Sequence, residues 1–362
     1  MFLILLATVA GGQQIPAPAG MPEQLPGTPL PPPPMPSLLA WTVDLPAAPA
    51  VSPIITADAV IASYLPGFVA AFSRDDGRHR WQAEVAPDGP LVSDGTFVFV
   101  ASGEAVHALR LEDGTLAWRS ATGALTAPMV AREGWLLAAT QGKLTALRTA
   151  DGSRVWTVES GSQRETAAIS GDVLFVPYAD GRLVARDLAS GAAKWSRRLA
   201  GAPAEPFVLG NDVFVGATDK QFYSLDAASG EARWQRRVGA TVRGRAASDG
   251  ERVYFAALDN MIYAVDRRHG AVRWHKGVPF RPWSGPVAAG NSVFVAGPGS
   301  ELRVLMAASG ATGTSVAFPG QLARNPGFLE TQEGAVFAVV TGSLAETWKL
   351  SLTLPIAVAN PR

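Results

Sequence analysis

The sequence predicts an all-β fold that is built from repeated copies of one four-stranded unit. Three observations lead to this fold class. A glycine–tryptophan motif recurs along the chain, apolar runs alternate with polar residues, and no helical periodicity is present. The 362 residues are 48% apolar and 17% charged, which is a globular rather than a disordered composition.

The repeat is marked by a glycine that precedes a tryptophan by four residues. The six complete copies are Gly77 with Trp81, Gly114 with Trp118, Gly152 with Trp156, Gly191 with Trp195, Gly230 with Trp234 and Gly270 with Trp274. Successive tryptophans are 37, 38, 39, 39 and 40 residues apart. A seventh copy keeps Gly310 but has Thr314 in place of tryptophan, and Trp41 lies 40 residues before Trp81. We interpret the glycines as turn residues and the tryptophans as structural groups that pack one unit against the next.

Each unit carries the signals of four antiparallel strands. An apolar, β-branched run follows a glycine, as in DVFVGA at 212–217, and a second run follows a turn, as in FYSLDAA at 222–228. The repeated glycine turn and a strand led by tryptophan come next, and a shorter strand precedes the first glycine. Four short strands in about forty residues are typical of a β-propeller blade.

The phase of the repeat predicts eight blades. Strands in the tryptophan phase start at residues 41, 81, 118, 156, 195, 234, 274 and 314. The chain provides only three strands for the last blade before Pro355, so we expect the strand from Trp41 to Leu45 to complete that blade and close the ring. Seven blades with unpaired ends are the alternative.

The repeat resembles that of PQQ-like, quinoprotein-type propellers over residues 39–354. The resemblance rests on segments such as YSLDAASGEARW at 223–234 and AVDRRHGAVRW at 264–274. An eight-bladed body behind an export signal is similar to the BamB-type propellers of the outer-membrane assembly machinery. This resemblance implies a non-catalytic scaffold that binds protein partners. The alternative that it implies is a quinone- or sugar-binding, dehydrogenase-like domain with a ligand site at the channel mouth.

The chain ends carry features of their own. Residues 1–14 contain an apolar run that is too short to span a bilayer, and we interpret them as a signal segment, although no basic residue precedes the run. Residues 15–38 are a proline-rich linker, and residues 355–362 are a C-terminal tail. We therefore expect a periplasmic or otherwise exported protein, with the apolar N-terminus of a cytoplasmic protein as the alternative.

The composition argues against several kinds of chemistry. Because the chain has no cysteine, it has no disulfide, thiolate zinc site, iron–sulfur cluster, cysteine nucleophile or cysteine-linked lipid anchor. Its four histidines lack metal-ligand spacing. The quinoprotein dehydrogenases that the repeat resembles cover their quinone with a disulfide and carry large insertions, and this chain has neither. We expect no enzyme activity, no catalytic residues, no metal and no cofactor, PQQ included.

Charge is sorted along the chain and predicts a partner surface. Residues 1–181 carry 10 basic and 17 acidic side chains, and residues 182–281 carry 17 basic and 10 acidic ones. The candidate partner patch lies at the ends of outermost strands and comprises Arg197, Arg198, Arg236 and Arg237, with Lys276 at its margin. We expect a monomer that binds an acidic protein surface there, and no nucleic acid or transmembrane span. Protection of the strand edges is the alternative.

A second candidate site lies where the chain reaches the innermost strands. Alignment of the repeats brings six residues to the mouth of the axial channel: Arg164, Glu165, Glu205, Arg243, Arg245 and Trp283. These residue types would suit a small anionic or peptide ligand. The alternative is a solvated rim of paired arginines and glutamates.

Overall fold

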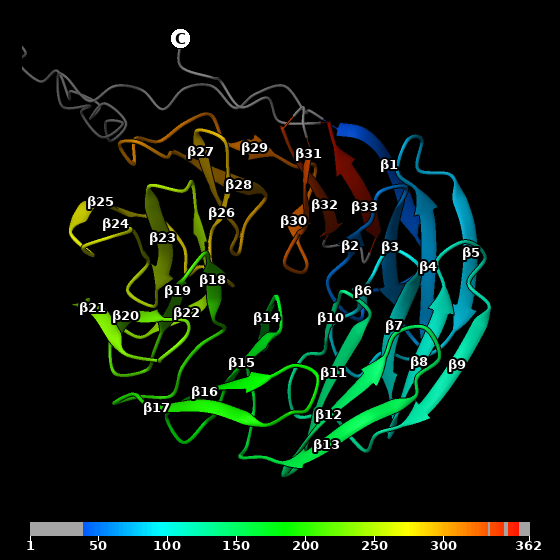
Figure 1. Ribbon diagram of the computed structural model, residues 1–362. Coiled ribbons are helices and arrows are strands. Elements are labelled where there is room, and N and C mark those ends of the chain that lie inside the picture. The colour runs from blue at the N-terminus through cyan, green and yellow to red at the C-terminus, as the bar shows by residue number, and fades with distance from the viewer. Residues whose placement is uncertain (1–38, 332–333, 344–346, 355–362) are drawn as a thin grey trace, which may run out of the picture. The chain divides into compact units, whose positions relative to one another are not determined.

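The computed structural model describes residues 39–331, 334–343 and 347–354. The predicted signal segment 1–14, the linker 15–38 and the tail 355–362 lie outside the described residues. Within the described part, all regular structure is β, and no helix there could cross a bilayer. The strands form eight antiparallel sheets that follow one another around a ring, from blue to red in Figure 1.

Blades 1 to 7 each run from an innermost to an outermost strand. The first three blades contain β2 (Ile54–Ile55), β3 (Ala59–Tyr64), β4 (Phe68–Ser73), β5 (His79–Glu84); β6 (Val92–Ser93), β7 (Phe97–Ser102), β8 (Ala105–Arg110), β9 (Leu116–Ala121); β10 (Val130–Arg132), β11 (Trp135–Thr140), β12 (Lys143–Arg148) and β13 (Arg154–Glu159).

Blades 4 to 7 continue the same order around the ring. They contain β14 (Ala168–Ser170), β15 (Val173–Pro177), β16 (Arg182–Asp187), β17 (Ala193–Arg198); β18 (Phe207–Leu209), β19 (Asp212–Gly216), β20 (Gln221–Asp226), β21 (Ala232–Arg237); β22 (Val242–Ser248), β23 (Arg252–Ala257), β24 (Met261–Asp266), β25 (Val272–Gly277); β26 (Val287–Ala289), β27 (Ser292–Val295), β28 (Glu301–Met306) and β29 (Val316–Ala317).

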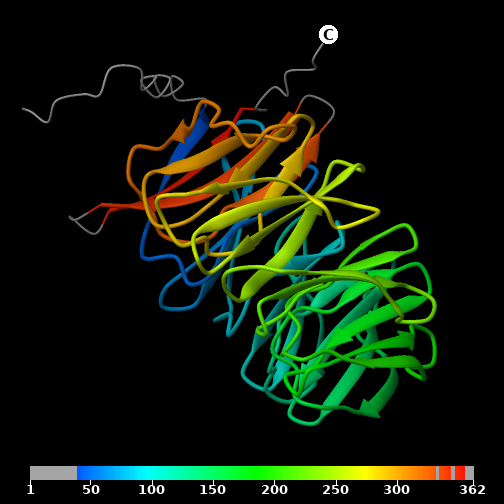
Figure 2. The ribbon, with the colours of Figure 1, turned by 90° about the vertical axis from the view of Figure 1, so that its left-hand side faces the viewer.

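Blade 8 combines the two ends of the chain, and this confirms the predicted ring closure. Strand β1 (Leu39–Leu45) is the outermost strand and pairs antiparallel with β33 (Trp348–Thr353), so that Trp41 lies opposite Leu352. Next come β32 (Gly334–Gly342) and the innermost strand β31 (Gly327–Thr331). The blue β1 lies beside the red β33 in Figure 1, and blue and red strands lie together in Figure 2.

Blade 8 also departs from the four-stranded prediction. Strand β32 has nine residues, and its end at Thr341 and Gly342 pairs with an extra short strand, β30 (Gln321–Leu322). The sheet therefore has five strands, because the long β32 extends past β31 and leaves backbone groups for a second partner.

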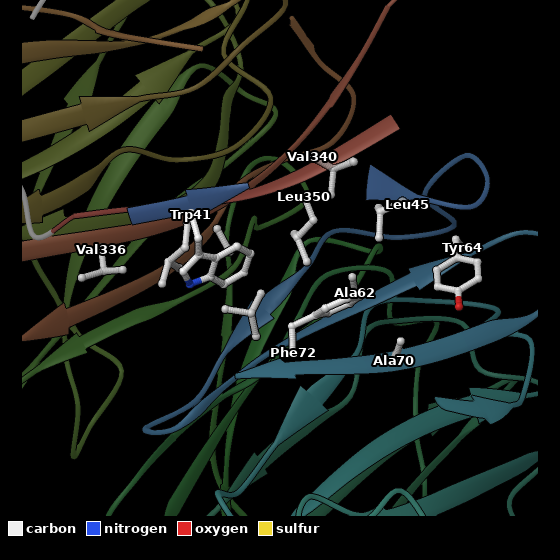
Figure 3. Packing of buried hydrophobic residues seen from close by; sticks show 12 residues of the cluster. Trp41, Leu45, Ala62, Tyr64, Ala70, Phe72, Val336, Val340 and Leu350 are labelled. Atoms are coloured by element: carbon white, nitrogen blue, oxygen red, sulfur yellow. The ribbon is translucent and has the colours of Figure 1, made fainter. Parts of the chain in front are cut away.

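The apolar core lies between neighbouring blades. Middle strands such as β3, which is buried along its whole length, have both faces covered, so their apolar runs are continuous rather than alternating. Between blades 8 and 1, Trp41 and Leu350 pack with Ala62 and Phe72 (Figure 3). The ring thus closes through the same kind of buried contact that joins the other blades.

Each repeated tryptophan contacts the repeated glycine of the following blade. A Cβ atom placed on any of the seven glycines would lie 2.5–2.8 Å from that ring, and the glycines have φ of 65–74°. Each indole Nε1 also donates a hydrogen bond of 2.7–3.0 Å to the carbonyl oxygen three residues before the glycine. The pairs are Trp41 with Gly77, Trp81 with Gly114, Trp118 with Gly152, Trp156 with Gly191, Trp195 with Gly230, Trp234 with Gly270 and Trp274 with Gly310.

The Trp–Gly contact can be separated from backbone strain by two alanine variants. Gly230→Ala and Gly134→Ala both place alanine at positive φ, which costs roughly 1–2 kcal/mol. Only at Gly230 would the new Cβ meet a ring, that of Trp195, whereas nothing lies within 4 Å at Gly134. We expect Gly230→Ala to lower the free energy of unfolding by about 1–3 kcal/mol more than Gly134→Ala, measured by urea denaturation. Equal losses would mean that the contact contributes nothing.

Candidate functional site

The blades have two chemically different ends. At the connecting end, the chain leaves an outermost strand and crosses to the next innermost strand, beside the turn between the second and third strands. At the turn end lie the repeated glycine turns. Both predicted sites belong mainly to the connecting end of blades 4 to 6.

The axial channel contains a cavity of about 560 Å³ that is lined by innermost strands around the ring. Most of its lining residues have apolar side chains, but polar atoms form the larger part of its surface, and its charged lining residues are Arg132, Glu205 and Arg245. Arg132 is paired with Glu133 at 3.1 Å, near the turn end. Glu205 and Arg245 are thus the charged residues that line this cavity at the other end.

Glu205 lies just before β18 and is partly buried. Burial raises the pKa of its carboxyl group to about 7, the charge of Arg245 opposes this, and the charge of Glu165 adds to it. Arg245 lies with its guanidinium carbon 5.0 Å from the centre of the Phe207 ring. Glu205 can therefore hold or release a proton near neutral pH beside a fixed cation.

A bulge in β22 presents Arg243 and Arg245. Arg243 pairs with Ala256 and Ala247 pairs with Tyr254, so three residues on β22 oppose one on β23. Gly244, between the arginines, has φ of 69°, and a Cβ there would lie 2.2 Å from the backbone nitrogen of Gly285. The Arg-Gly-Arg segment thus depends on glycine, which allows both the bulge and the close approach of blade 7.

A second cavity, of about 230 Å³, lies beside the channel. Arg164, Glu165 and Arg243 line it together with Tyr178 and Pro203. Burial raises the pKa of Glu165, and the charge of Arg243 partly offsets this effect. Five of the six predicted channel-mouth residues thus fall into two adjoining cavities.

Trp283 is the sixth predicted residue, and it lies apart. It sits in the connection to β26, is 38% exposed, and lines neither cavity. Sequence reasoning missed Phe207, whose ring lies against the Arg245 guanidinium, and Tyr178, which lines the second cavity just after β15. The Arg-Gly-Arg segment was the one available signal for the bulge.

The four arginines of the candidate partner patch lie at the connecting ends of β17 and β21. Residues alternate between the two faces of a strand, so Arg197 shares the face of Trp195, which packs toward blade 5. Its charge acts on Tyr223 of blade 5, whereas the charge of Arg198 acts on Asp180. The Nε of Arg236 donates to the carbonyl of Gly270 at 2.9 Å, so the backbone of this arginine lies near the connecting end but its guanidinium reaches toward the glycine turn of blade 6.

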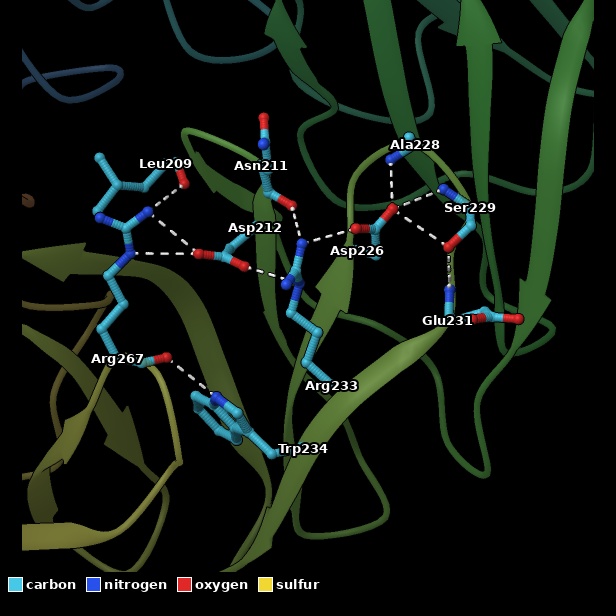
Figure 4. Close-up of polar contacts among 10 residues, drawn as sticks. All are labelled: Leu209, Asn211, Asp212, Asp226, Ala228, Ser229, Glu231, Arg233, Trp234 and Arg267. Carbon is cyan, nitrogen blue, oxygen red and sulfur yellow. Dashed lines mark hydrogen bonds and ion pairs between the residues drawn. The ribbon is translucent and has the colours of Figure 1, made fainter.

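The two ends of these blades differ in how many of their charged side chains form ion pairs. At the turn end, Asp212 lies 3.1 Å from Arg267 and 3.0 Å from Arg233, and Arg233 also contacts Asp226 at 2.6 Å (Figure 4). Further pairs there join Lys194 to Asp172 and Asp187, Arg252 to Asp249, and Arg273 to Asp266. The acidic side chains of the turn end thus pair with most of its basic ones, although Arg268 has no described carboxylate oxygen within 4.0 Å.

The basic groups of the connecting end and the adjoining channel are mostly unpaired. Arg182 pairs with Asp180 at 2.8 Å. Among the described residues, the others have no carboxylate oxygen within 4.0 Å: Arg164, Arg197, Arg198, Lys220, Arg236, Arg237, Arg243, Arg245, Lys276 and Arg281. Asp219 and Asp259 also lie at this end, in the turns after β19 and β23, but the basic groups outnumber the carboxylates, so this end of blades 4 to 6 carries net positive charge.

The described residues offer no sign of a metal centre. Nowhere in 39–331, 334–343 and 347–354 do three or more His, Asp or Glu side chains gather so that they could hold a metal ion.

The fold and the repeated Trp–Gly contacts define a PQQ-like β-propeller. A family model for outer membrane protein assembly factor BamB matches residues 65–276 and 200–339, which span most of the chain. The chain belongs to the BamB family.

Individual relatives are distant. The BamB of Yersinia pestis is 30% identical over 115 residues, which are 27% of this chain and 29% of the relative. The crystal structure of BamB from Moraxella catarrhalis has a TM-score of 0.72 at 17% identity and covers 87% of this chain and 99% of its own. The crystal structure of quinohemoprotein alcohol dehydrogenase from Comamonas testosteroni has a TM-score of 0.69 at 12% identity. The match covers 90% of this chain and 77% of the dehydrogenase. These two likenesses are of fold alone.

The titration of Glu205 should show in stability. Its pKa rises from 4.5 to about 7 on folding, so the folded state binds a proton more tightly. Stability should therefore fall as pH rises from about 4.5 to 7. We expect Glu205→Gln to gain on the order of 1–3 kcal/mol over the parent between pH 5 and pH 8, measured by urea denaturation. A difference that is constant with pH would contradict the buried position of this carboxyl group.

Proposed function

We propose that the protein is an exported, non-catalytic scaffold that binds a protein partner during outer-membrane protein assembly. Membership of the BamB family supports this role. The curated relative is matched over only 29% of its length, so partners and process are proposals for this chain. Work at the outer membrane requires export, and the apolar residues 1–14 suit a signal segment.

The observation that carries the proposal is the unpaired positive charge at the connecting end of blades 4 to 6. Charged groups without partners contribute little to stability but attract and orient a surface of opposite sign. The turn end of the same blades shows that this chain can neutralise its arginines when neighbouring carboxylates are present. We therefore propose that an acidic protein surface docks across Arg197, Arg198, Arg236 and Arg237, with Lys276 at its margin.

Charge reversal tests this docking face. In the variant, glutamate replaces all four arginines. The parent and the variant are each used as bait in affinity capture from the envelope of the native host, after mild crosslinking. We expect captured outer-membrane assembly components to fall at least tenfold and to weaken with added salt, while the melting temperature changes little. A matched control reverses four exposed arginines of blades 2 and 3, Arg110, Arg119, Arg148 and Arg154. Unchanged capture by the first variant would leave edge protection as the role of these residues.

A second candidate function rests on the channel cavity with Glu205 and Arg245. Its volume and mixed polarity suit a small quinone or sugar ligand. Against this reading, the blade spacing of 37–40 residues leaves no insertion to enclose a substrate, and no cysteine is present to cover a quinone.

Quinone binding distinguishes the two candidate functions. We expect purified protein mixed with pyrroloquinoline quinone and calcium to show the sum of the separate absorption spectra, and no quinone-dependent dye reduction with alcohols or sugars. A spectral shift that saturates with quinone, and that Glu205→Gln or Arg245→Gln abolishes, would overturn the scaffold proposal in favour of the enzyme.

A further inference from the structure

The irregular build of blade 8 creates a pocket that the docking proposal does not use. The connection from β29 to β31 carries the extra strand β30, and it stands beside the start of blade 1. Between blades 7, 8 and 1 lies a pocket of about 670 Å³. Its lining segments, the crossings to β31 and β2 and the turn between β32 and β33, lie at the connecting end. In Figure 1, β30 and β33 lie across the ring from β16 and β17.

The walls of this pocket are largely apolar and fixed in place. Phe318 and Leu322 are 7% and 5% exposed, and Trp348 and Pro49 complete the apolar lining. A Cβ on Gly342 would lie 2.4 Å from the Trp348 ring, so the indole rests directly on the backbone of β32. The aromatic surface is thus formed before any ligand arrives.

One cation stands at the edge of the pocket. Arg324 donates from Nη2 to the carbonyl oxygens of Pro49 at 3.1 Å and Ala50 at 3.4 Å, and from Nη1 to that of Ala323 at 3.2 Å. Among the described residues, no carboxylate oxygen lies within 4.0 Å of Arg324, and no acidic residue lines the pocket. The backbone carbonyls orient the guanidinium without neutralising it, so part of its donor capacity stays available.

We propose that this pocket binds a small amphipathic carboxylate, with its apolar body against Phe318, Leu322 and Trp348 and its carboxylate on Arg324. The volume falls in the range of small-molecule sites, and such sites combine apolar walls with a few placed polar groups. Arginine forms strong, charge-assisted hydrogen bonds to carboxylates. Because the pocket joins blades 7, 8 and 1, a bound ligand would also stabilise the ring where its two chain ends meet.

Two matched probes isolate the carboxylate contact. 4-Phenylbutyrate and its neutral amide, 4-phenylbutanamide, have nearly the same shape, and isothermal titration calorimetry gives the affinity of each. We expect the parent to bind the acid at least tenfold more tightly than the amide. Arg324→Gln should remove that preference and leave amide binding unchanged. Arg281→Gln, which removes an exposed arginine outside the pocket, should keep the preference.

The apolar walls are tested separately. Trp348→Leu should weaken binding of both probes by at least fivefold, while circular dichroism confirms that the variant is folded. The acid should raise the melting temperature of the parent more than that of Arg324→Gln. If neither probe binds the parent at millimolar concentration, or if Arg324→Gln binds the acid as the parent does, the proposal is wrong. None of these outcomes depends on partner capture.

Discussion

Seven of the eight junctions between blades depend on one contact, in which an indole ring lies on a glycine of the following blade. The contact needs glycine twice over, because φ is positive and because any Cβ would enter the ring. The indole N–H satisfies a carbonyl oxygen in the same turn, so a large apolar group is buried without leaving its polar atom unpaired. The spacing of the blades then follows from the spacing of these residues along the chain.

The eighth junction shows the limits of this contact. A tryptophan at position 314 would have to lie over the turn between the third and fourth strands of blade 8. That turn does not exist, because the fourth strand is β1 and comes from the other end of the chain. The loss of tryptophan at Thr314 is therefore a consequence of ring closure. The same break in regularity accompanies the five-stranded sheet and the pocket between blades 7, 8 and 1.

The two ends of the blades carry different charge. Turns at one end bring aspartates and arginines of neighbouring blades together, and they form ion pairs such as that of Asp212 with Arg267. Crossings at the other end bring arginines together with few carboxylates, and part of that charge borders partly buried Glu165 and Glu205. A scaffold with one neutralised end and one positive end has a built-in direction for a partner to recognise.

The sequence by itself determined the fold class, the number of blades and the closure by the N-terminal strand. These follow from a local motif in constant phase, and local turn and packing signals are what a single sequence carries. Only the tertiary structure decided which charged groups meet. A bulge in β22 sets the position of Arg245, strand alternation places Arg197 and Arg198 on opposite faces of β17, and Trp283 lies apart from the cavities. The burial that raises the pKa of Glu205 depends on side chains from several blades. Their approach across the ring cannot be predicted from the spacing of residues along the chain.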